Sequence, residues 1–356
     1  MSPRYTVLGL GAGLAALVAL AVILLTFERP PIVAVQQGFR GTGMALVYNP
    51  RVVEAQAALN AVPEALEQQD DDGPRASEIY QNVQVLGNLS AGQFGRVMQA
   101  MTAWVAPEET VAGGGCNYCH NPANFADDYP YTKVVARRML QMVQQINAQH
   151  APHVGQTGVT CYTCHRGNPV PVANWSPPAP NQRFGNFAAV ETGQNRPSAA
   201  GDLSSLPLDP YSPFLLGNEP IRVVGSTPLP SGNRSSIKQT EWTYSLMTHF
   251  SQALGVGCTH CHNSRQFSSW PESTPQRVTA WHGINMVRDI NTNYIETLRP
   301  VFPANRLGPA GEPLMANCTT CHQGAYKPLY GASMLRDYQE LNRVTQGPTE
   351  IRRLEP

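Results

Sequence analysis

All eight cysteines of this 356-residue chain stand in one repeated pattern, C-x-x-C-H. The pattern occurs four times, at residues 116–120, 161–165, 258–262 and 318–322. C-x-x-C-H is the attachment sequence of haem c: the two thiols form thioether links to the porphyrin, and the next residue turns its imidazole onto the iron. The histidine must follow at once, because the short tether fixes the ring edge beside the metal. The sequence therefore predicts four covalently bound c-type haems.

Three other uses of paired cysteines fit the pattern less well. Zinc sites and redox dithiols use C-x-x-C, but neither needs a histidine after every pair. Structural disulfides would not repeat a two-residue gap four times. The predicted thioether residues are Cys116, Cys119, Cys161, Cys164, Cys258, Cys261, Cys318 and Cys321. The predicted first iron ligands are His120, His165, His262 and His322.

Charge and composition exclude two other classes of protein. The chain has 25 basic and 25 acidic residues, and a nucleic-acid-binding protein needs a basic excess. Apolar residues make up 42% of the chain, which is enough to build a core and excludes a disordered polyelectrolyte.

The N-terminal region contains one long apolar segment. Residues 7–25 carry no charge, and as a helix they would span about 28 Å, close to the ~30 Å core of a bilayer. A cleaved signal peptide has a shorter apolar region that is followed by a small-residue cleavage site. We therefore expect a retained single transmembrane helix. Covalent haem attachment belongs to the periplasmic side, so the haem domain is expected there.

The chain contains an internal repeat. The first two motifs and the last two form similar halves, and residues 142–147 (MVQQIN) match residues 286–291 (MVRDIN). Each unit reads as a helix, a turn and a haem motif, and two units make a half. The expected fold class is mainly α with much irregular loop: a multihaem cytochrome c of two pseudo-repeated di-haem halves, preceded by one transmembrane helix.

The repeat breaks at one position that bears on the second iron ligands. Aligning Met142 with Met286 sets Met139 opposite Gly283, and glycine costs about 1 kcal/mol in a helix interior relative to alanine. If Met139 binds the second iron, the fourth iron lacks the equivalent ligand and must take one from elsewhere or stay open. Gly283 would then give room to the porphyrin.

The remaining second ligands have rivals. Met98 and Met101 lie one helical turn apart before the first motif, and spacing does not choose between them. Met247 is the only methionine in the apolar stretch before the third motif, where core packing is its alternative role. Five histidines lie outside the ligating positions of the motifs: His150, His153, His249, His260 and His282.

At this point the chain resembles the tetrahaem cytochrome subunit of the purple-bacterial photosynthetic reaction centre. The resemblance covers about residues 28–338 and is far more specific than C-x-x-C-H alone. The segments that carry it are residues 38–41 (GFRG), 80–89 (YQNVQVLGNL), 129–131 (YPY), 134–139 (VVARRM), 153–161 (HVGQTGVTC), 273–277 (STPQR), 286–291 (MVRDIN) and 327–333 (KPLYGAS).

The resemblance implies three Met–His haems and one bis-His haem of lower potential. Its Phe-x-Arg-x-Met pattern falls on residues 94–98 and selects Met98. The loop after this helix is longer than in the family, with residues 109–113 as extra residues. Met139 and Met247 match the second and third methionine ligands. His153 matches the ligand that reaches across to the fourth haem, with His150 as its close rival. Arg277 matches an arginine beside the third haem, where a cation would raise the potential; its alternative is a surface salt bridge.

The resemblance also implies a function. An electron carrier of this family, rather than an enzyme, re-reduces the photo-oxidised bacteriochlorophyll special pair on the L and M subunits. Its electrons come from a soluble donor such as cytochrome c2 or a high-potential iron–sulfur protein. The third-motif haem lies nearest the special pair, followed outward by the fourth, second and first. The expected location is the inner (intracytoplasmic) membrane, with a single-pass anchor and the haem domain in the periplasm.

Two other functions remain as alternatives. A membrane-anchored tetrahaem quinol dehydrogenase also has one N-terminal helix and four motifs, usually in a much shorter chain. A multihaem reductase would need an iron with an open site. The predicted organisation is 1–28 membrane anchor helix, 29–92 N-terminal segment, 93–170 first di-haem half, 171–240 connecting segment, 241–335 second di-haem half and 336–356 C-terminal tail.

Overall fold

The computed structural model describes residues 3–27, 29–38, 43–178, 206–207, 209–223 and 237–342. Within them the chain is mostly helical with long irregular loops, as the sequence predicted. The helices are α1 (Pro3–Thr26), α2 (Pro50–Ala55), α3 (Ala76–Ile79), α4 (Ala91–Val105), α5 (Tyr131–Gln149), α6 (Ala151–Val154), α7 (Cys161–His165), α8 (Ile237–Leu254), α9 (Pro275–Asp289) and α10 (Cys318–His322). The strands are β1 (Val33–Gln36) and β2 (Ala45–Tyr48).

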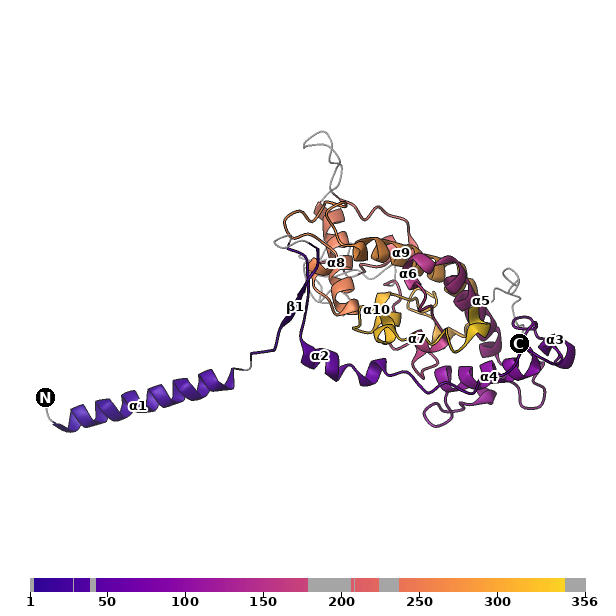
Figure 1. The fold of residues 1–356 in the computed structure, drawn as a ribbon, viewed down its shortest axis with the longest axis horizontal. Helices are drawn as coiled ribbons and strands as arrows, with labels where there is room; N and C mark the ends of the chain where they lie inside the picture. The colour runs from indigo at the N-terminus through magenta and orange to yellow at the C-terminus, as the bar shows by residue number, and fades with distance from the viewer. Residues whose placement is uncertain are drawn as a thin grey trace, which may run out of the picture.

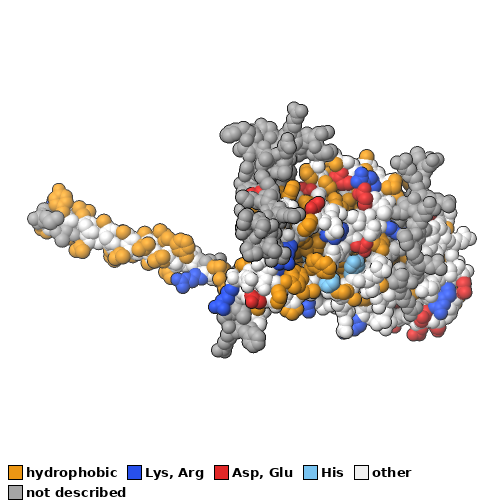
Figure 2. All heavy atoms as spheres, turned by 90° about the horizontal axis from the view of Figure 1, so that it is seen from above, with side chains coloured by type: hydrophobic (Ala, Val, Ile, Leu, Met, Phe, Trp, Pro, Cys, Tyr) orange, Lys and Arg blue, Asp and Glu red, His pale blue; other side chains and the backbone are white. Residues whose placement is uncertain are grey.

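Helix α1 stands apart from the rest of the molecule. Its apolar side chains are exposed along its whole length, and it projects from the body as a largely hydrophobic rod (Figures 1 and 2). Basic side chains gather where the rod meets the body (Figure 2). By length and composition α1 could cross a membrane, although a signal sequence would have the same properties.

Strands β1 and β2 form an antiparallel hairpin that the sequence analysis did not predict. The hairpin lies against the third motif: the Thr259 hydroxyl donates to the Ala45 carbonyl at 2.9 Å, and Gln37 Nε2 lies 3.2 Å from His260 Nδ1. The chain that leaves α1 therefore reaches the body at the third motif. Helices α3 and α4 lie at the opposite end of the body (Figure 1).

Four long helices carry the methionines considered in the sequence analysis. Met98 lies in α4, Met139 in α5 and Met247 in α8, while α9 carries Gly283. Helix α4 begins at a capping box, in which the Ser90 hydroxyl accepts from the Gln93 amide. Each of these helices precedes one haem motif along the chain, as the predicted unit of helix, turn and motif requires.

The start of the predicted C-terminal tail belongs to the core. Arg96 in α4 donates to Glu340 at 3.0 Å in a buried ion pair, and its guanidinium lies 4.0 Å from the ring centre of Tyr338. Tyr338 in turn packs edge-on against Trp104, with ring centroids 4.6 Å apart. Residues 343–356 of the tail, and 179–205, 208 and 224–236 of the connecting segment, lie outside the described residues.

Candidate haem-binding sites

The four motifs adopt two local shapes. The first and third motifs begin with 3-10 turns, Cys116–Tyr118 and Cys258–His260, whereas the second and fourth are the one-turn helices α7 and α10. The local shape of the motif therefore alternates along the chain.

Glycines after the second and fourth motifs attach them to the long helices. Gly167 and Gly324 have φ angles of +81° and +82°, a region that residues with a Cβ rarely adopt. The Gly167 amide donates to the Trp104 carbonyl, and the Gly324 amide donates to the Ala253 carbonyl, each at 2.8 Å. These bonds join α7 to α4 and α10 to α8. They explain why Cys-His-x-Gly recurs in these two motifs.

An asparagine in each half holds the chain just before these motifs. Asn147 exchanges two hydrogen bonds with the backbone of Val159, at 3.0 and 2.8 Å. Asn291 makes the same pair of bonds with the backbone of Ala316, at 3.0 and 2.9 Å. Val159 and Ala316 each stand two residues before the first cysteine of a motif. The sequence repeat pointed to both asparagines, but it did not reveal this role.

Each motif histidine uses one ring nitrogen in the same way. The Nδ1 atom lies within hydrogen-bond distance of a backbone carbonyl oxygen, which can only accept, so Nδ1 carries the proton. The other nitrogen, Nε2, is then the acceptor and the possible metal ligand, and this arrangement is usual for metal-binding histidines. The four contacts are His120 to Phe125 at 3.2 Å, His165 to Asn168 at 2.8 Å, His262 to Phe267 at 2.9 Å and His322 to Ala325 at 2.9 Å.

His153 follows the same rule, although it lies outside the motifs. Its Nδ1 is 2.9 Å from the Thr279 carbonyl of α9, and its ring centroid is 6.0 Å from that of His322. An imidazole nitrogen binds a first-row metal at about 2.0–2.1 Å, so two imidazoles on opposite sides of one metal have centroids about 6 Å apart. The separation therefore leaves room for one iron between His153 and His322.

The space beside Gly283 is filled by the imidazole ring of His153, whereas the sequence predicted a porphyrin there. A Cβ added to Gly283 would lie 2.5 Å from Cε1 and 2.8 Å from Nδ1 of His153. Among the described residues, the glycine thus makes room for an imidazole ring, whereas we had expected it to make room for a porphyrin. His153 therefore packs against the position at which the second half lacks the methionine.

His150, the rival of His153, is engaged differently. It caps the end of α5, and its Nε2 lies 3.0 Å from the Asp289 carboxylate. The nitrogen that would bind a metal therefore faces an acidic side chain.

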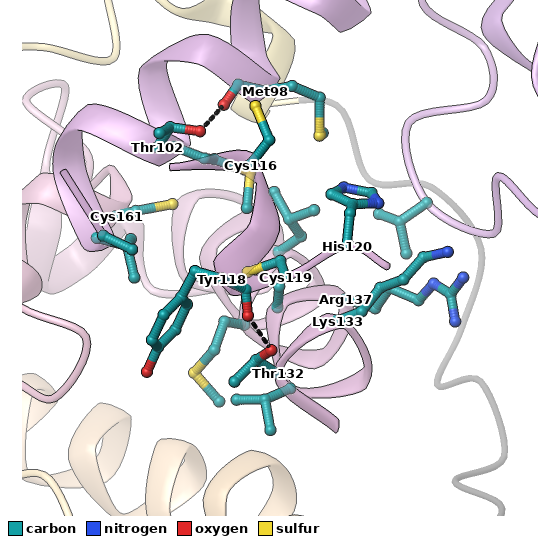
Figure 3. A pocket seen from close by; sticks show the side chains of 18 of the residues that line it. Met98, Thr102, Cys116, Tyr118, Cys119, His120, Thr132, Lys133, Arg137 and Cys161 are labelled. Atoms are coloured by element: carbon teal, nitrogen blue, oxygen red, sulfur yellow. Dashed lines mark hydrogen bonds between the residues drawn. The ribbon is translucent and has the colours of Figure 1, made fainter. Parts of the chain in front are cut away.

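The first two motifs open onto one large cavity of about 450 Å³. Met98, Cys116, Cys119 and His120 line it together with Thr102 and Thr132, and the cations Lys133 and Arg137 flank His120 (Figure 3). The full set of methionines along its wall is Met98, Met101, Met139 and Met142. The structure thus brings the predicted ligands Met98 and Met139 into the cavity, together with Met101, the rival of Met98, and with Met142.

Arg277 lies beside the third motif, and Met247 lies in α8, the helix that precedes it. Met247 is partly buried against the core. The Arg277 guanidinium donates to the Ser269 carbonyl and the Ser273 hydroxyl, both at 2.7 Å, and lies 4.6 Å from the ring centre of Trp270. Burial lowers the pKa of His262, and the positive charge of Arg277 lowers it further. The cation is therefore close enough to act on this site. None of the ion pairs found among the described residues involves Arg277.

Burial also controls protonation at the motifs. It raises the pKa of the Cys119 thiol to about 11 and those of Cys161 and Cys318 to about 12. A reactive redox dithiol needs a lowered pKa, so the raised values of Cys119 and Cys161 disfavour that alternative at the first two motifs. In the fourth motif, the contact with Cys164 lowers the pKa of Cys321. Burial and the neighbouring His153 lower the pKa of His322 to about 4, which keeps this imidazole neutral and able to bind a metal.

Contacts between elements place the second and fourth motifs in a series between α4 and α8. Helix α4 contacts α7, α7 contacts α10, and α10 contacts α8. At the middle of the series the Sγ atoms of Cys164 and Cys321 are 2.7 Å apart, so the second and fourth motifs are direct neighbours. The third motif, which follows α8, lies beside the hairpin at the end where α1 leaves the body (Figure 1).

Comparisons with known proteins show the family of the chain. The family model described as "Photosynthetic reaction centre cytochrome C subunit" matches residues 28–342. The chain is 52% identical to the photosynthetic reaction center cytochrome c subunit of Rubrivivax gelatinosus, over 91% of this chain and 87% of the relative. It is 50% identical to the Thermochromatium tepidum protein of the same name, over 93% and 81%. The Roseobacter denitrificans protein of that name is 38% identical, over 88% and 86%. These matches do not favour a quinol dehydrogenase.

Proposed function

The chain belongs to the photosynthetic reaction centre cytochrome c subunits, and on that premise we propose that it carries four covalent haems in a fixed order. Its role is electron transfer in the reaction centre, and the comparisons name no enzymatic activity. Each haem, when bound, supplies a one-electron iron couple whose potential depends on its axial ligands. The protein's task is to hold the four irons at set distances and to tune those potentials.

The proposed ligands follow from the donor set. His120, His165, His262 and His322 supply one imidazole to each iron. Met98, Met139 and Met247 supply the second ligand of the first three irons, and His153 supplies that of the fourth. The observation that carries the histidine ligands is the shared geometry of five imidazoles, each with Nδ1 on a carbonyl oxygen and Nε2 left to bind.

The proposed electron path runs through the motifs in the order first, second, fourth, third. The series of contacts from α4 to α7, α10 and α8 supports this order, as does the short distance between Cys164 and Cys321. The third motif would then lie nearest the membrane, because it adjoins the hairpin that leads from α1. The first motif would face the aqueous phase and its donor.

The proposed partners follow from the same arrangement. The third-motif end would rest on the L and M subunits in the membrane, with the haem domain in the periplasm. A soluble donor, such as cytochrome c2 or a high-potential iron–sulfur protein, would deliver electrons at the other end. Helix α1 would remain as a single membrane anchor, so the purified protein should retain its N-terminal residues. A mature form that begins near residues 26–30 would contradict this anchor.

Arg277 is proposed to raise the potential of the third haem. Its guanidinium is held in place by Ser269, Ser273 and Trp270, and it acts electrostatically on the third motif. A cation at this position disfavours the oxidised and more positive iron, so the site holds its electron more tightly.

Flash photolysis of membranes that contain the subunit tests the proposed role. A short flash that oxidises the special pair should be followed by fast haem oxidation, first at the third haem and then along the series. The reduced donor should then re-reduce the oxidised haems. Haem absorbance that does not respond to the flash in such membranes would overturn the proposed function.

A further inference from the structure

Ser245 and His249, on one buried face of α8, each carry a polar atom that has no hydrogen-bond partner among the described residues. These atoms are the Ser245 hydroxyl oxygen and His249 Nε2, on side chains that are 0% and 3% exposed. The two residues are four apart in the helix, so their side chains lie one turn apart on the same face. Leaving a buried polar group unpaired is costly, and a native protein usually provides a partner.

The ring of His249 is held in one orientation. Its Nδ1 lies 3.1 Å from the Tyr211 hydroxyl, and the two rings meet edge to face with centroids 4.8 Å apart. Tyr211 packs in turn against Trp175, at 5.0 Å between centroids. A hydroxyl can donate to Nδ1, and the proton of the neutral ring then resides on Nε2. In this tautomer Nε2 is a hydrogen-bond donor, and the described residues offer it no acceptor.

This face of α8 looks toward the fourth motif. Ala253, one turn further along the face, accepts the hydrogen bond from Gly324 that ties α10 to α8. Trp175 also belongs to this region, because its indole donates to the carbonyl of Ala316, two residues before the motif. Met247, the proposed ligand of the third iron, is two residues from His249 and therefore projects from the far side of the helix.

We propose that His249 Nε2 and the Ser245 hydroxyl donate hydrogen bonds to a propionate carboxylate of the haem at the fourth motif. A carboxylate accepts several hydrogen bonds and donates none, which matches two donors one turn apart. Haem carries such groups on the porphyrin edge, and burying one requires donors around it. The inference rests on the proposed function, because it requires a haem at the fourth motif.

The expected consequence is a shift in the potential of one haem. The two donors offset the negative charge of the carboxylate, and without them that charge favours the oxidised iron. In the complete membrane-bound protein, His249→Leu should lower the equilibrium constant for reduction of the fourth haem by up to about tenfold. For a one-electron couple this corresponds to about 59 mV. Ser245→Ala should lower it by less.

Two further variants separate this role from ordinary packing. His249→Gln keeps an N–H donor near the position of Nε2, so it should restore most of the potential. Thr248→Val removes a hydroxyl from the same helix, where it donates to the Tyr244 carbonyl, and should leave all potentials unchanged. The potential of the first haem, measured in the same titration, serves as the internal control.

Redox titration of the wild type and these variants tests the proposed hydrogen bonds to the propionate. A fourth-haem potential that falls in His249→Leu and recovers in His249→Gln supports the inference. Four haems per chain with an unmoved fourth potential in His249→Leu would overturn it, and a buried water as the partner of Nε2 would give that result. Equal shifts in the Leu and Gln variants would also overturn it. Fewer than four haems in the wild type would instead overturn the proposed function.

Discussion

Replacing Gly283 by alanine should disturb the fourth haem through a single methyl group. The added Cβ would lie 2.5 Å from Cε1 of His153, whereas ordinary contacts begin near 3.4 Å, so the ring must move by about 0.9 Å. The ring has little freedom, because its Nδ1 is bonded to the Thr279 carbonyl at 2.9 Å and its Nε2 is proposed to bind the iron.

The magnitude follows from the cost of overpacking. Inserting a methyl group into a packed site costs about 1–3 kcal/mol, and if that strain falls on ligation, binding of His153 to the iron weakens by roughly fivefold to 150-fold. The helix itself should gain about 1 kcal/mol, because alanine replaces glycine in α9. Gly283→Ala should therefore raise the fourth-haem potential and introduce a high-spin component, since a strongly donating imidazole is lost from the iron.

The assay combines redox titration with magnetic circular dichroism of the purified protein. Ala280→Gly is the matched control, because it changes helix propensity by about the same amount in the same helix but removes a methyl group, so it adds no atom against His153. It should lower the thermal midpoint and leave the spectrum unchanged. A Gly283→Ala protein with a fully low-spin fourth haem and an unchanged potential would refute the reasoning.

Three further substitutions test other parts of the account. Met98→Leu should remove the methionine ligand of the first haem and lower its potential, whereas Met101→Leu should leave that potential unchanged; the reverse result in the same titration would exchange their roles. Arg277→Leu should lower the third-haem potential, and Arg277→Lys should keep most of it; a third-haem potential that Arg277→Leu does not move would reject the tuning role. Glu340→Ala leaves Arg96 buried without its carboxylate and should lower the free energy of unfolding by about 3–5 kcal/mol in denaturant titrations, and a loss below 1 kcal/mol would show that the pair is dispensable.

The motifs and long helices could be predicted because their signals are local. C-x-x-C-H fixes both the cofactor and its first ligand within five residues, and the matching segments 142–147 and 286–291 indicate a helix before the second and fourth motifs. The alignment of Met139 with Gly283 also implied that the fourth iron must take a ligand from a distant part of the chain. The packing of His153 against Gly283 agrees with that inference and gives it a physical cause.

The features that the sequence did not predict depend on contacts between distant segments of the chain. The hairpin of β1 and β2 consists of two four-residue strands whose partner, the third motif, lies more than 200 residues away. The buried pair of Arg96 and Glu340 joins positions 244 residues apart, so the tail looked like an appendage in the sequence. The sequence did not distinguish His249 from the other histidines outside the motifs, because its unpaired Nε2 becomes visible only when its surroundings are known. The two-fold pseudo-repeat of whole halves stays a prediction, although paired details such as Asn147 and Asn291 agree with it.

The most direct test of the account is the axial ligation of the four irons in the purified, fully oxidised protein. Near-infrared magnetic circular dichroism distinguishes His–Met from His–His haems. The account predicts four low-spin haems, three with His–Met ligation and one with His–His ligation, and loss of the His–His signal in His153→Ala but not in His150→Ala. Four His–Met haems, two or more His–His haems, or a high-spin haem in the wild-type protein would contradict it.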